Sequence, residues 1–245
     1  MSVRIPWQAG LAITIGAGAG VPLLAVAAAP LCGRLLGLDI QNGFNLPYLF
    51  VQHGLQLLFA LLLIVLARRM APADYGLHWP RGKTYIPQAA MWGAIFAVVM
   101  TLIGFAPEIF AGHSPQLDYK LTTGNVTGWL FFEGVYVGPT EEIPFRALLV
   151  TFLATVMPGR VRVGAYEMNK AGVIVAFMFA LSHITSFWTD WWPLALGQQA
   201  YAFALGVLYA YWLEKSGSVV APIIGHNVGD GLAYVIMFVW VWLAA

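Results

Sequence analysis

Charged residues are scarce in this sequence. Only 9% of its 245 residues are charged, while 60% are hydrophobic. A water-soluble domain has about 25% charged residues, so this composition excludes a soluble globule and makes the lipid bilayer the main solvent. The net charge of +1 and the short basic clusters provide no basic face for nucleic acid. A single cysteine, Cys32, excludes an internal disulfide and a cysteine zinc cage.

Long apolar runs take the place of the missing polar surface. A helix needs about 20 mostly apolar residues to cross a bilayer. Seven stretches reach this length, at 7–31, 47–67, 85–106, 125–157, 171–189, 195–213 and 218–244. The stretch 125–157 is too long for one straight crossing, so it is tilted, kinked or divided, and eight spans are the alternative. The sequence predicts an all-α transmembrane helix bundle that forms a single integral-membrane domain over residues 1–245.

Basic residues near the span ends predict the orientation, because lysine and arginine resist translocation. Most of them fall in loops on one side, namely Arg4, Arg68, Arg69, Arg81, Lys83, Arg160, Arg162, Lys170 and Lys215. The other side carries Arg34 and Lys120 together with the acidic residues Asp39, Glu108, Asp118 and Asp190. We therefore expect a cytoplasmic N-terminus and, for seven spans, a C-terminus outside. An alternative interpretation of residues 1–29 is a signal peptide, because a basic residue precedes an apolar run that ends in alanines.

Ionisable side chains within the predicted spans are the main functional signal, because they are costly in lipid unless they face a partner or a cavity. Six of them stand out by their spacing, namely Glu141, Glu142, Arg146, His183, His226 and Asp230. Side chains four residues apart share one helical face, so Glu142 can meet Arg146 and His226 can meet Asp230. Glu141 points about 100° away from Glu142. Without a partner on its own helix, Glu141 is expected to be neutral or to contact histidine, water or metal.

The backbone around these glutamates is also unusual. Pro139 and Pro144 each lack an N–H, so the helix must kink or break between them. If a new helix begins at Thr140 or Glu141, both carboxylates lie at its N-terminus, where the helix dipole favours an anion. Counting the helical rise along each span puts the glutamates and histidines at overlapping depths. Broken helices at membrane depth line wet cavities, so we predict a water-filled pocket.

Further polar residues lie in or near the spans, and interhelical hydrogen bonding or an interfacial position is the simplest interpretation of each. They are His53, Gln52, Gln56, Glu133, Gln198 and Gln199. Glu133 stands apart, because it lies about two helical turns before Glu141 in the same stretch.

The ionisable residues match a known family in type and order. The pair of glutamates followed four later by Arg146 resembles the EExxxR motif of the CAAX prenyl protease and bacteriocin-processing (CPBP, or Abi) membrane family. Phe179 to His183 resembles its FxxxH motif, and His226 to Asp230 resembles its third motif, a histidine followed four later by Asn or Asp. The resemblance covers roughly residues 72–235 and leaves two N-terminal spans, in residues 1–71, without a recognised motif.

The resemblance implies an intramembrane endopeptidase, similar to the type II CAAX prenyl endopeptidase, in what we expect to be a prokaryotic plasma membrane. It implies that Glu141 is the general base that acts with His183 on a water molecule, and that Glu142 and Arg146 orient the site. His226 and residue 230 would then bind the oxyanion, a role that suits hydrogen-bond donors.

Two points of this scheme stay open. An ionised Asp230 only accepts hydrogen bonds, so it is better suited to orient His226, and Asn227 is an alternative donor. No cofactor is favoured, although Glu141, His183 and His226 could form a zinc set with water as the fourth ligand.

The expected partners are the lipid bilayer and a lipidated or membrane-embedded peptide. A prenylated C-terminus, a leader peptide and a C-terminal sorting segment all fit this description. The alternatives are a zinc-dependent endopeptidase with the same residues, a non-catalytic scaffold or immunity protein, and a transporter with a proton relay.

Overall fold

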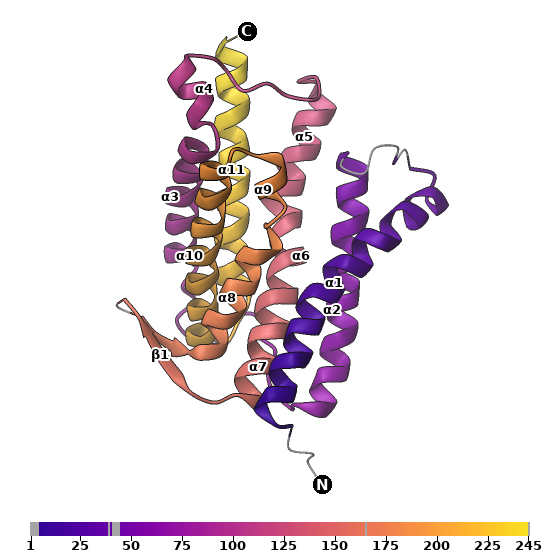
Figure 1. Ribbon diagram of the computed structural model, residues 1–245, viewed down its shortest axis with the longest axis vertical. Helices are drawn as coiled ribbons and strands as arrows, with labels where there is room; N and C mark the ends of the chain where they lie inside the picture. Colours follow the sequence, from indigo (N-terminus) through magenta and orange to yellow (C-terminus); the bar gives the residue numbers. More distant parts are fainter. Residues whose placement is uncertain (1–4, 39, 41–44, 165, 245) are drawn as a thin grey trace.

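Long helices run along one main direction in the computed structural model of the chain (Figure 1). The structure describes residues 5–38, 40, 45–164 and 166–244. Arg4 and Asp39, which contribute to the predicted orientation, lie outside the described residues. The helices are α1 (Trp7–Leu35), α2 (Leu46–Met70), α3 (Ile86–Gly104), α4 (Ala106–Ala111), α5 (Thr123–Phe131), α6 (Val137–Glu142), α7 (Thr151–Val156), α8 (Lys170–Ser182), α9 (Ser186–Thr189), α10 (Trp192–Ser216) and α11 (Val220–Ala244).

The fold class is confirmed as a helical membrane bundle. Among the described residues, five helical segments are long and apolar enough to cross a membrane, namely Trp7–Leu35, Leu46–Met70, Ile86–Gly104, Lys170–Thr189 and Val220–Ala244. The count of seven spans stays a prediction, with α10 and the helical stretch 123–156 as its two remaining members. Helix α1 begins at one end of the bundle, and α11 ends at the other (Figure 1).

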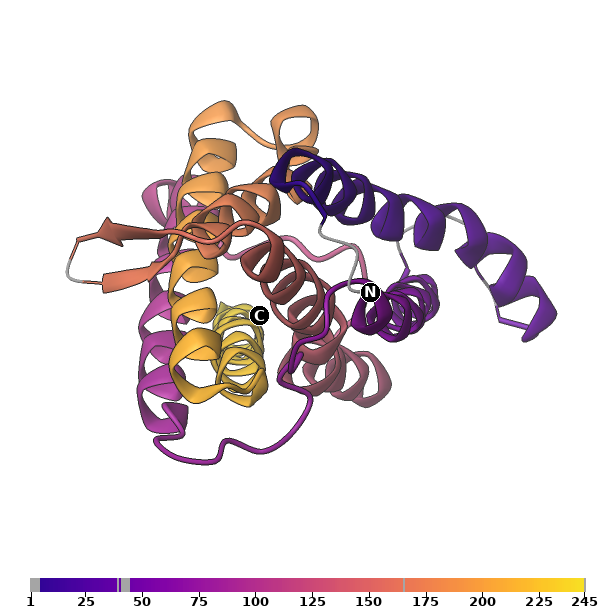
Figure 2. The same cartoon turned by 90° about the horizontal axis from the view of Figure 1, so that it is seen from below.

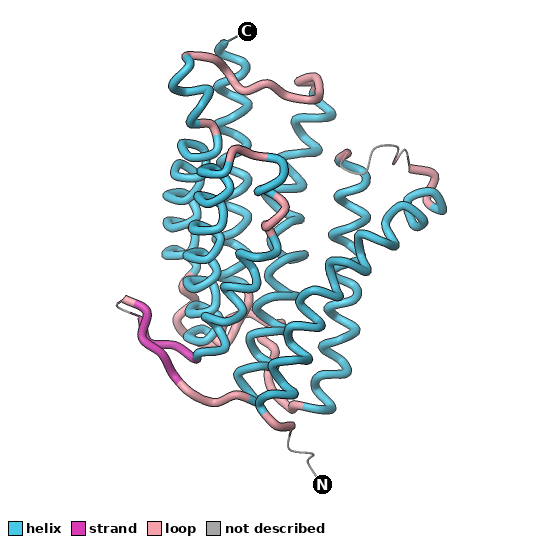
Figure 3. The backbone as a smooth tube through the Cα atoms, in the orientation of Figure 1, coloured by secondary structure: helices cyan, strands magenta, loops and turns pink. Residues whose placement is uncertain are grey.

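A short β-hairpin interrupts the helices. Strands β1 (Arg160–Val163) and β2 (Tyr166–Asn169) pair antiparallel, with Arg160 opposite Asn169. The hairpin projects from the N-terminal end of the bundle (Figure 3). Arg160 ties it to α10, because its Nη2 donates to Glu214 Oε1 at 2.9 Å.

The loop between α2 and α3 lies at the same end and is fixed by local hydrogen bonds. The backbone N–H of Gly76 donates to Asp74 Oδ1 at 3.0 Å, and this bond lowers the pKa of the Asp74 carboxyl. The Ser218 hydroxyl donates to the carbonyl of His78, and Val219 N–H donates to the carbonyl of Gly76 at 3.0 Å. The loop is therefore attached to the turn between α10 and α11.

The helical stretch 123–156, here called the motif helix, occupies the centre of the bundle. It contacts α11 on one side and α2 on the other, while α1 packs against α2, α3 against α11 and α8 against α10. Figure 2 shows this arrangement along the bundle axis. Side chains of both α2 and α11 can therefore reach the polar residues of the motif helix.

The motif helix widens on each side of its glutamates. The π-helical turns η1 (Phe132–Tyr136) and η2 (Ile143–Val150) flank α6, and the backbone stays helical throughout. The predicted distortion is present, but of the alternatives considered, a new helix that begins at Thr140 or Glu141 is not the one found. Both glutamates lie at the C-terminal end of α6, so the dipole of a helix N-terminus does not act on them.

The two prolines explain where the neighbouring helices attach. In an α-helix the carbonyl of residue i accepts from the N–H of residue i+4, so Pro139 leaves Val135 without a donor and Pro144 leaves Thr140 without one. Asn227 Nδ2 donates to the Val135 carbonyl at 3.1 Å, and Gln56 Nε2 donates to the Thr140 carbonyl at 2.9 Å. Side-chain amides from α11 and α2 thus replace the two missing backbone donors.

Candidate functional site

A buried ion pair lies at the centre of the site. Arg146 and Glu142 are both fully buried, and Arg146 Nε lies 2.8 Å from Glu142 Oε2. The guanidinium carbon also lies 4.6 Å from the ring centroid of Phe179 and 5.7 Å from that of Tyr209. Its Nη1 and Nη2 have no hydrogen-bond partner within the part of the chain that the structure describes. Aromatic faces therefore complete the environment of this charge.

His226 connects this ion pair to Asp230. Its Nδ1 lies 2.9 Å from Glu142 Oε1, and its Nε2 lies 3.0 Å from Asp230 Oδ2. Tyr209 stacks on the ring, with the two centroids 6.0 Å apart. The contacts expected from four-residue spacing, Glu142 with Arg146 and His226 with Asp230, are thus present. A histidine that donates to carboxylates from both nitrogens is an imidazolium.

Glu141 lies between two histidines. Its Oε1 is 3.3 Å from His53 Nε2 on α2, and its Oε2 is 3.9 Å from His226 Nε2 on α11. The side chain is 18% exposed, whereas that of Glu142 is fully buried. The two adjacent carboxylates therefore differ in role, since Glu142 is enclosed by its partners and Glu141 remains accessible.

His183 lies where α8 ends, and its Nδ1 is 3.0 Å from the carbonyl oxygen of Phe179. A carbonyl only accepts, so Nδ1 carries the proton and a neutral ring keeps its lone pair on Nε2. The predicted span 171–189 is not one helix, because it stops at Ser182 and resumes as α9 at Ser186. The His183 carbonyl accepts from Ser186 N–H at 3.1 Å and from Gln199 Nε2 at 3.0 Å, and these bonds hold the break.

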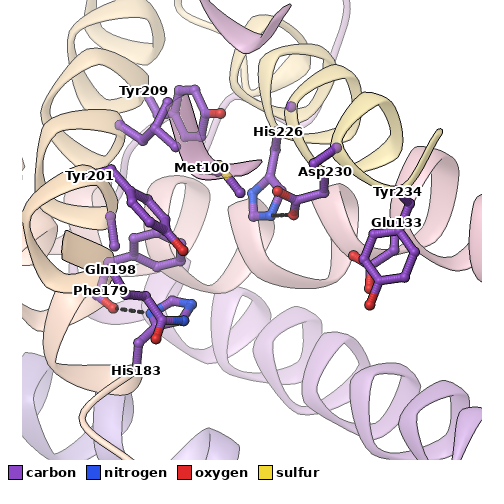
Figure 4. A pocket seen from close by; sticks show the side chains of 14 residues that line it. Met100, Glu133, Phe179, His183, Gln198, Tyr201, Tyr209, His226, Asp230 and Tyr234 are labelled. Carbon is purple, nitrogen blue, oxygen red and sulfur yellow. Dashed lines mark hydrogen bonds and ion pairs between the residues drawn. The ribbon is translucent and has the colours of Figure 1, made fainter. Parts of the chain in front are cut away.

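A cavity of about 220 Å³ joins these elements. Figure 4 shows His183 on one side of it, His226 with Asp230 on another, and Glu133 with Tyr234 at its end. The lining residues come from the motif helix and from α3, α8, α10 and α11. Glu141 stands beside the wall formed by His226. The sequence predicts a water-filled pocket at the glutamates. A cavity lies at this place and Glu133 lines it, although Glu141 does not, and its filling by water stays a prediction.

The residues proposed for zinc do not converge on one point. No group of three histidine, cysteine, aspartate or glutamate side chains among residues 5–38, 40, 45–164 and 166–244 is placed to hold a metal ion. Both ring nitrogens of His226 already face carboxylate oxygens, so this rotamer offers no free lone pair to zinc. This arrangement does not fit a zinc site built from Glu141, His183 and His226.

Asn227 and His53 have different partners in the structure from those considered in the sequence. Asn227, considered as an oxyanion donor, gives its amide to the motif helix, since its Oδ1 accepts from Gly138 N–H at 2.8 Å and its Nδ2 donates to Val135. A Cβ at Gly138 would lie 2.2 Å from that Oδ1, so this close approach needs glycine. His53 makes the expected interhelical contact, but its partner is Glu141.

Comparison with known proteins agrees with this geometry. Residues 123–232 match the family described as type II CAAX prenyl endopeptidase Rce1-like. No curated protein and no solved structure matches the chain significantly. The matched segment contains all three sequence motifs and the residues that line the cavity, apart from Met100, Ala233 and Tyr234. Through this segment, a little under half of its length, the chain resembles the family described as type II CAAX prenyl endopeptidase Rce1-like.

Proposed function

We propose that this protein is an intramembrane endopeptidase that cuts a peptide bond in a membrane-associated or lipidated peptide. The observation that carries the proposal is the placement of Glu141. It is the accessible carboxylate of an adjacent pair, it lies between two histidines, and it stands beside a cavity that a third histidine lines. The family match over residues 123–232 supports the same reaction class.

Water activation is assigned to Glu141 and His183. A water molecule between Glu141 Oε2 and the cavity loses a proton to the carboxylate as its oxygen attacks the substrate carbonyl. His183 offers an unprotonated Nε2 toward the same space, so it can hold the attacking water in line. The C–N bond then breaks, and the proton passes to the leaving amine nitrogen, which yields a carboxylate and an amine.

Oxyanion stabilisation is assigned to His226. Its Nε2–H lies between Asp230 and Glu141, at 3.0 and 3.9 Å from their oxygens, and an imidazolium donor there can turn toward the substrate carbonyl. Glu142 holds the opposite nitrogen, and Arg146 holds Glu142. Asp230 is the orienting group in this proposal, because an ionised carboxylate has no proton to donate.

The substrate is proposed to be an extended peptide with an apolar anchor. Tyr201, Leu205 and Met100 give the cavity an apolar side, and Glu133 with Asp230 gives it an acidic side. A prenylated C-terminus, a leader peptide and a C-terminal sorting segment all present such a mixture. We propose that no metal takes part.

Reconstituted protein should be tested with a library of membrane-anchored peptides, and the fragments identified by mass spectrometry. Glu141→Gln should abolish cleavage, and His183→Ala should reduce it by about 100-fold or more, in the range of general acid–base catalysis. His113→Ala and Asp118→Asn are matched controls, because both residues are exposed at the far end of the bundle and should leave activity unchanged.

The mechanism fails if Glu141→Gln still cleaves at the wild-type rate. Incubation with a strong chelator distinguishes the metal-free mechanism from a zinc-dependent one. We expect activity to persist and no metal to co-purify in stoichiometric amount, whereas loss with chelator and recovery with zinc would establish the metalloendopeptidase.

A further inference from the structure

His53 lies outside the matched segment yet touches the carboxylate proposed as the base. It belongs to α2, its Nε2 is 3.3 Å from Glu141 Oε1, and its side chain is 13% exposed. Phe132 of the motif helix packs edge-on against its ring, with centroids 5.0 Å apart. Gln56, three residues later on the same face of α2, donates to Thr140, the residue before Glu141. These two side-chain contacts of α2 thus fall on adjacent residues of the motif helix.

The contact of His53 Nδ1, on the side of the ring away from Glu141, determines which ring nitrogen carries a proton. Nδ1 lies 3.1 Å from the carbonyl oxygen of Leu49, one helical turn earlier. Because a carbonyl only accepts, Nδ1 carries a proton, and Nε2 of a neutral ring has a lone pair. A lone pair cannot face a carboxylate oxygen at hydrogen-bond distance without a proton between them. The His53–Glu141 pair therefore holds one shared proton.

This contact distinguishes the two oxygens of Glu141. Oε1 is occupied by His53, while Oε2 faces His226 at 3.9 Å, a gap too long for a direct hydrogen bond. Oε2 is therefore the oxygen that can accept a hydrogen bond from the water to be activated. The carboxylate is consequently held in one orientation, with its free oxygen toward the histidines of the motifs.

We infer that His53 is a positioning residue for this site, which fixes Glu141 through Oε1 and so reserves Oε2 for the attacking water. The inference rests on the proposed function for its catalytic meaning. It makes α2 a part of the active site, although residues 46–70 lie before the segment that matches the family.

The contact itself can be tested without any substrate. Protein labelled with ¹⁵N in histidine is placed in lipid nanodiscs, and His53→Phe identifies the His53 signals by their loss. We expect a protonated Nδ1, and we expect Glu141→Gln to shift the Nε2 resonance of His53 and to leave that of His113 in place. An unprotonated Nδ1, or a His53 spectrum that ignores Glu141→Gln, overturns the inference.

Kinetics then test the role. His53→Phe keeps the ring against Phe132 but has no nitrogen, and we expect kcat to fall on the order of tenfold to a hundredfold, the worth of a hydrogen bond to a charged group, with KM unchanged. His53→Gln keeps a donor and should recover part of kcat. His113→Ala is the control for loss of a histidine elsewhere.

Different results would overturn the positioning role of His53 and the proposed endopeptidase function. If His53→Phe cleaves with the wild-type kcat, or if KM alone changes, the positioning role is overturned while the endopeptidase stands. If wild-type protein cleaves no peptide of the library, the proposed function is overturned, and the spectra still decide whether His53 holds Glu141.

Discussion

The replacement of backbone donors by side-chain amides predicts a specific energetic coupling. In wild type, Gln56 donates to the Thr140 carbonyl because Pro144 has no N–H to offer. Gln56→Leu keeps the volume roughly constant and leaves that carbonyl unpaired. Pro144→Ala provides an N–H at the position where an α-helix would use it. The damage caused by Gln56→Leu should therefore depend on which residue occupies position 144.

The magnitude follows from burial. Gln56 is 5% exposed and Thr140 is fully buried, so water cannot replace the lost donor. An unsatisfied buried acceptor costs about 1–3 kcal/mol, and hydrogen bonds within membrane bundles average about 0.6 kcal/mol with a maximum near 1.7. We expect Gln56→Leu to lower the free energy of unfolding by about 1–1.5 kcal/mol in the Pro144 background, and by less than about 0.5 kcal/mol with Pro144→Ala.

The assay is reversible unfolding in mixed detergent micelles, followed by the fluorescence of the ten tryptophans. Gln56→Leu combined with Pro139→Ala is the matched control, because the carbonyl that Pro139 leaves without a backbone donor is served by Asn227 and not by Gln56. The destabilising effects of these two changes should therefore add within about 0.5 kcal/mol. Asn227→Leu with Pro139→Ala should repeat the coupling on the other side. Equal losses from Gln56→Leu in both backgrounds would refute the argument that the amide serves the proline.

Three further predictions concern the ion pair, the third motif and the loop. Arg146→Met should lower the free energy of unfolding by about 3–5 kcal/mol, because it leaves Glu142 as an uncompensated buried charge. The double variant with Glu142→Gln should recover part of that loss. The same micelle assay measures both variants. Asp230→Asn should retain most peptide cleavage, because the amide oxygen still accepts from the motif histidine, whereas Asp230→Leu should lose it; equal activity of the two variants would contradict the orienting role. Since the folded pKa of Asp74 is lowered by its backbone hydrogen bond, its contribution to stability is present above the unfolded value of about 3.9 and is lost as the pH falls below it. Hydrogen exchange should therefore show the loop 71–85 losing protection below about pH 4, and Asp74→Asn should remove that pH dependence; an unchanged profile in the variant would disprove it.

The sequence predicted the local pairs well, because four-residue spacing fixes which side chains share a helical face. Glu142 with Arg146 and His226 with Asp230 follow from the chain alone. The long helices also follow from the apolar runs, since composition determines which segments prefer lipid. These features depend on neighbours in sequence or on the solvent.

Contacts between helices were harder to predict. His53 carries no motif and precedes Glu141 by 88 residues, so its spacing contains no signal of their contact. The prolines predicted a distortion but not its kind, because widening of the helix or a break depends on whether other helices provide donors. Asn227 and Gln56 do so, and the helix continues. The sequence marks Gln56 as a candidate for interhelical hydrogen bonding, but it contains no signal that Thr140 is the partner.

The dependence of the motif helix on two other helices has a consequence for biosynthesis. Asn227, His226 and Asp230 all lie on α11, which follows every other part of the site in the chain. While the ribosome is still translating that segment, the glutamates have no histidine from α11 and Val135 has no amide donor. The site is therefore completed last in chain order, and under the proposed function we expect peptide cleavage only after α11 has docked.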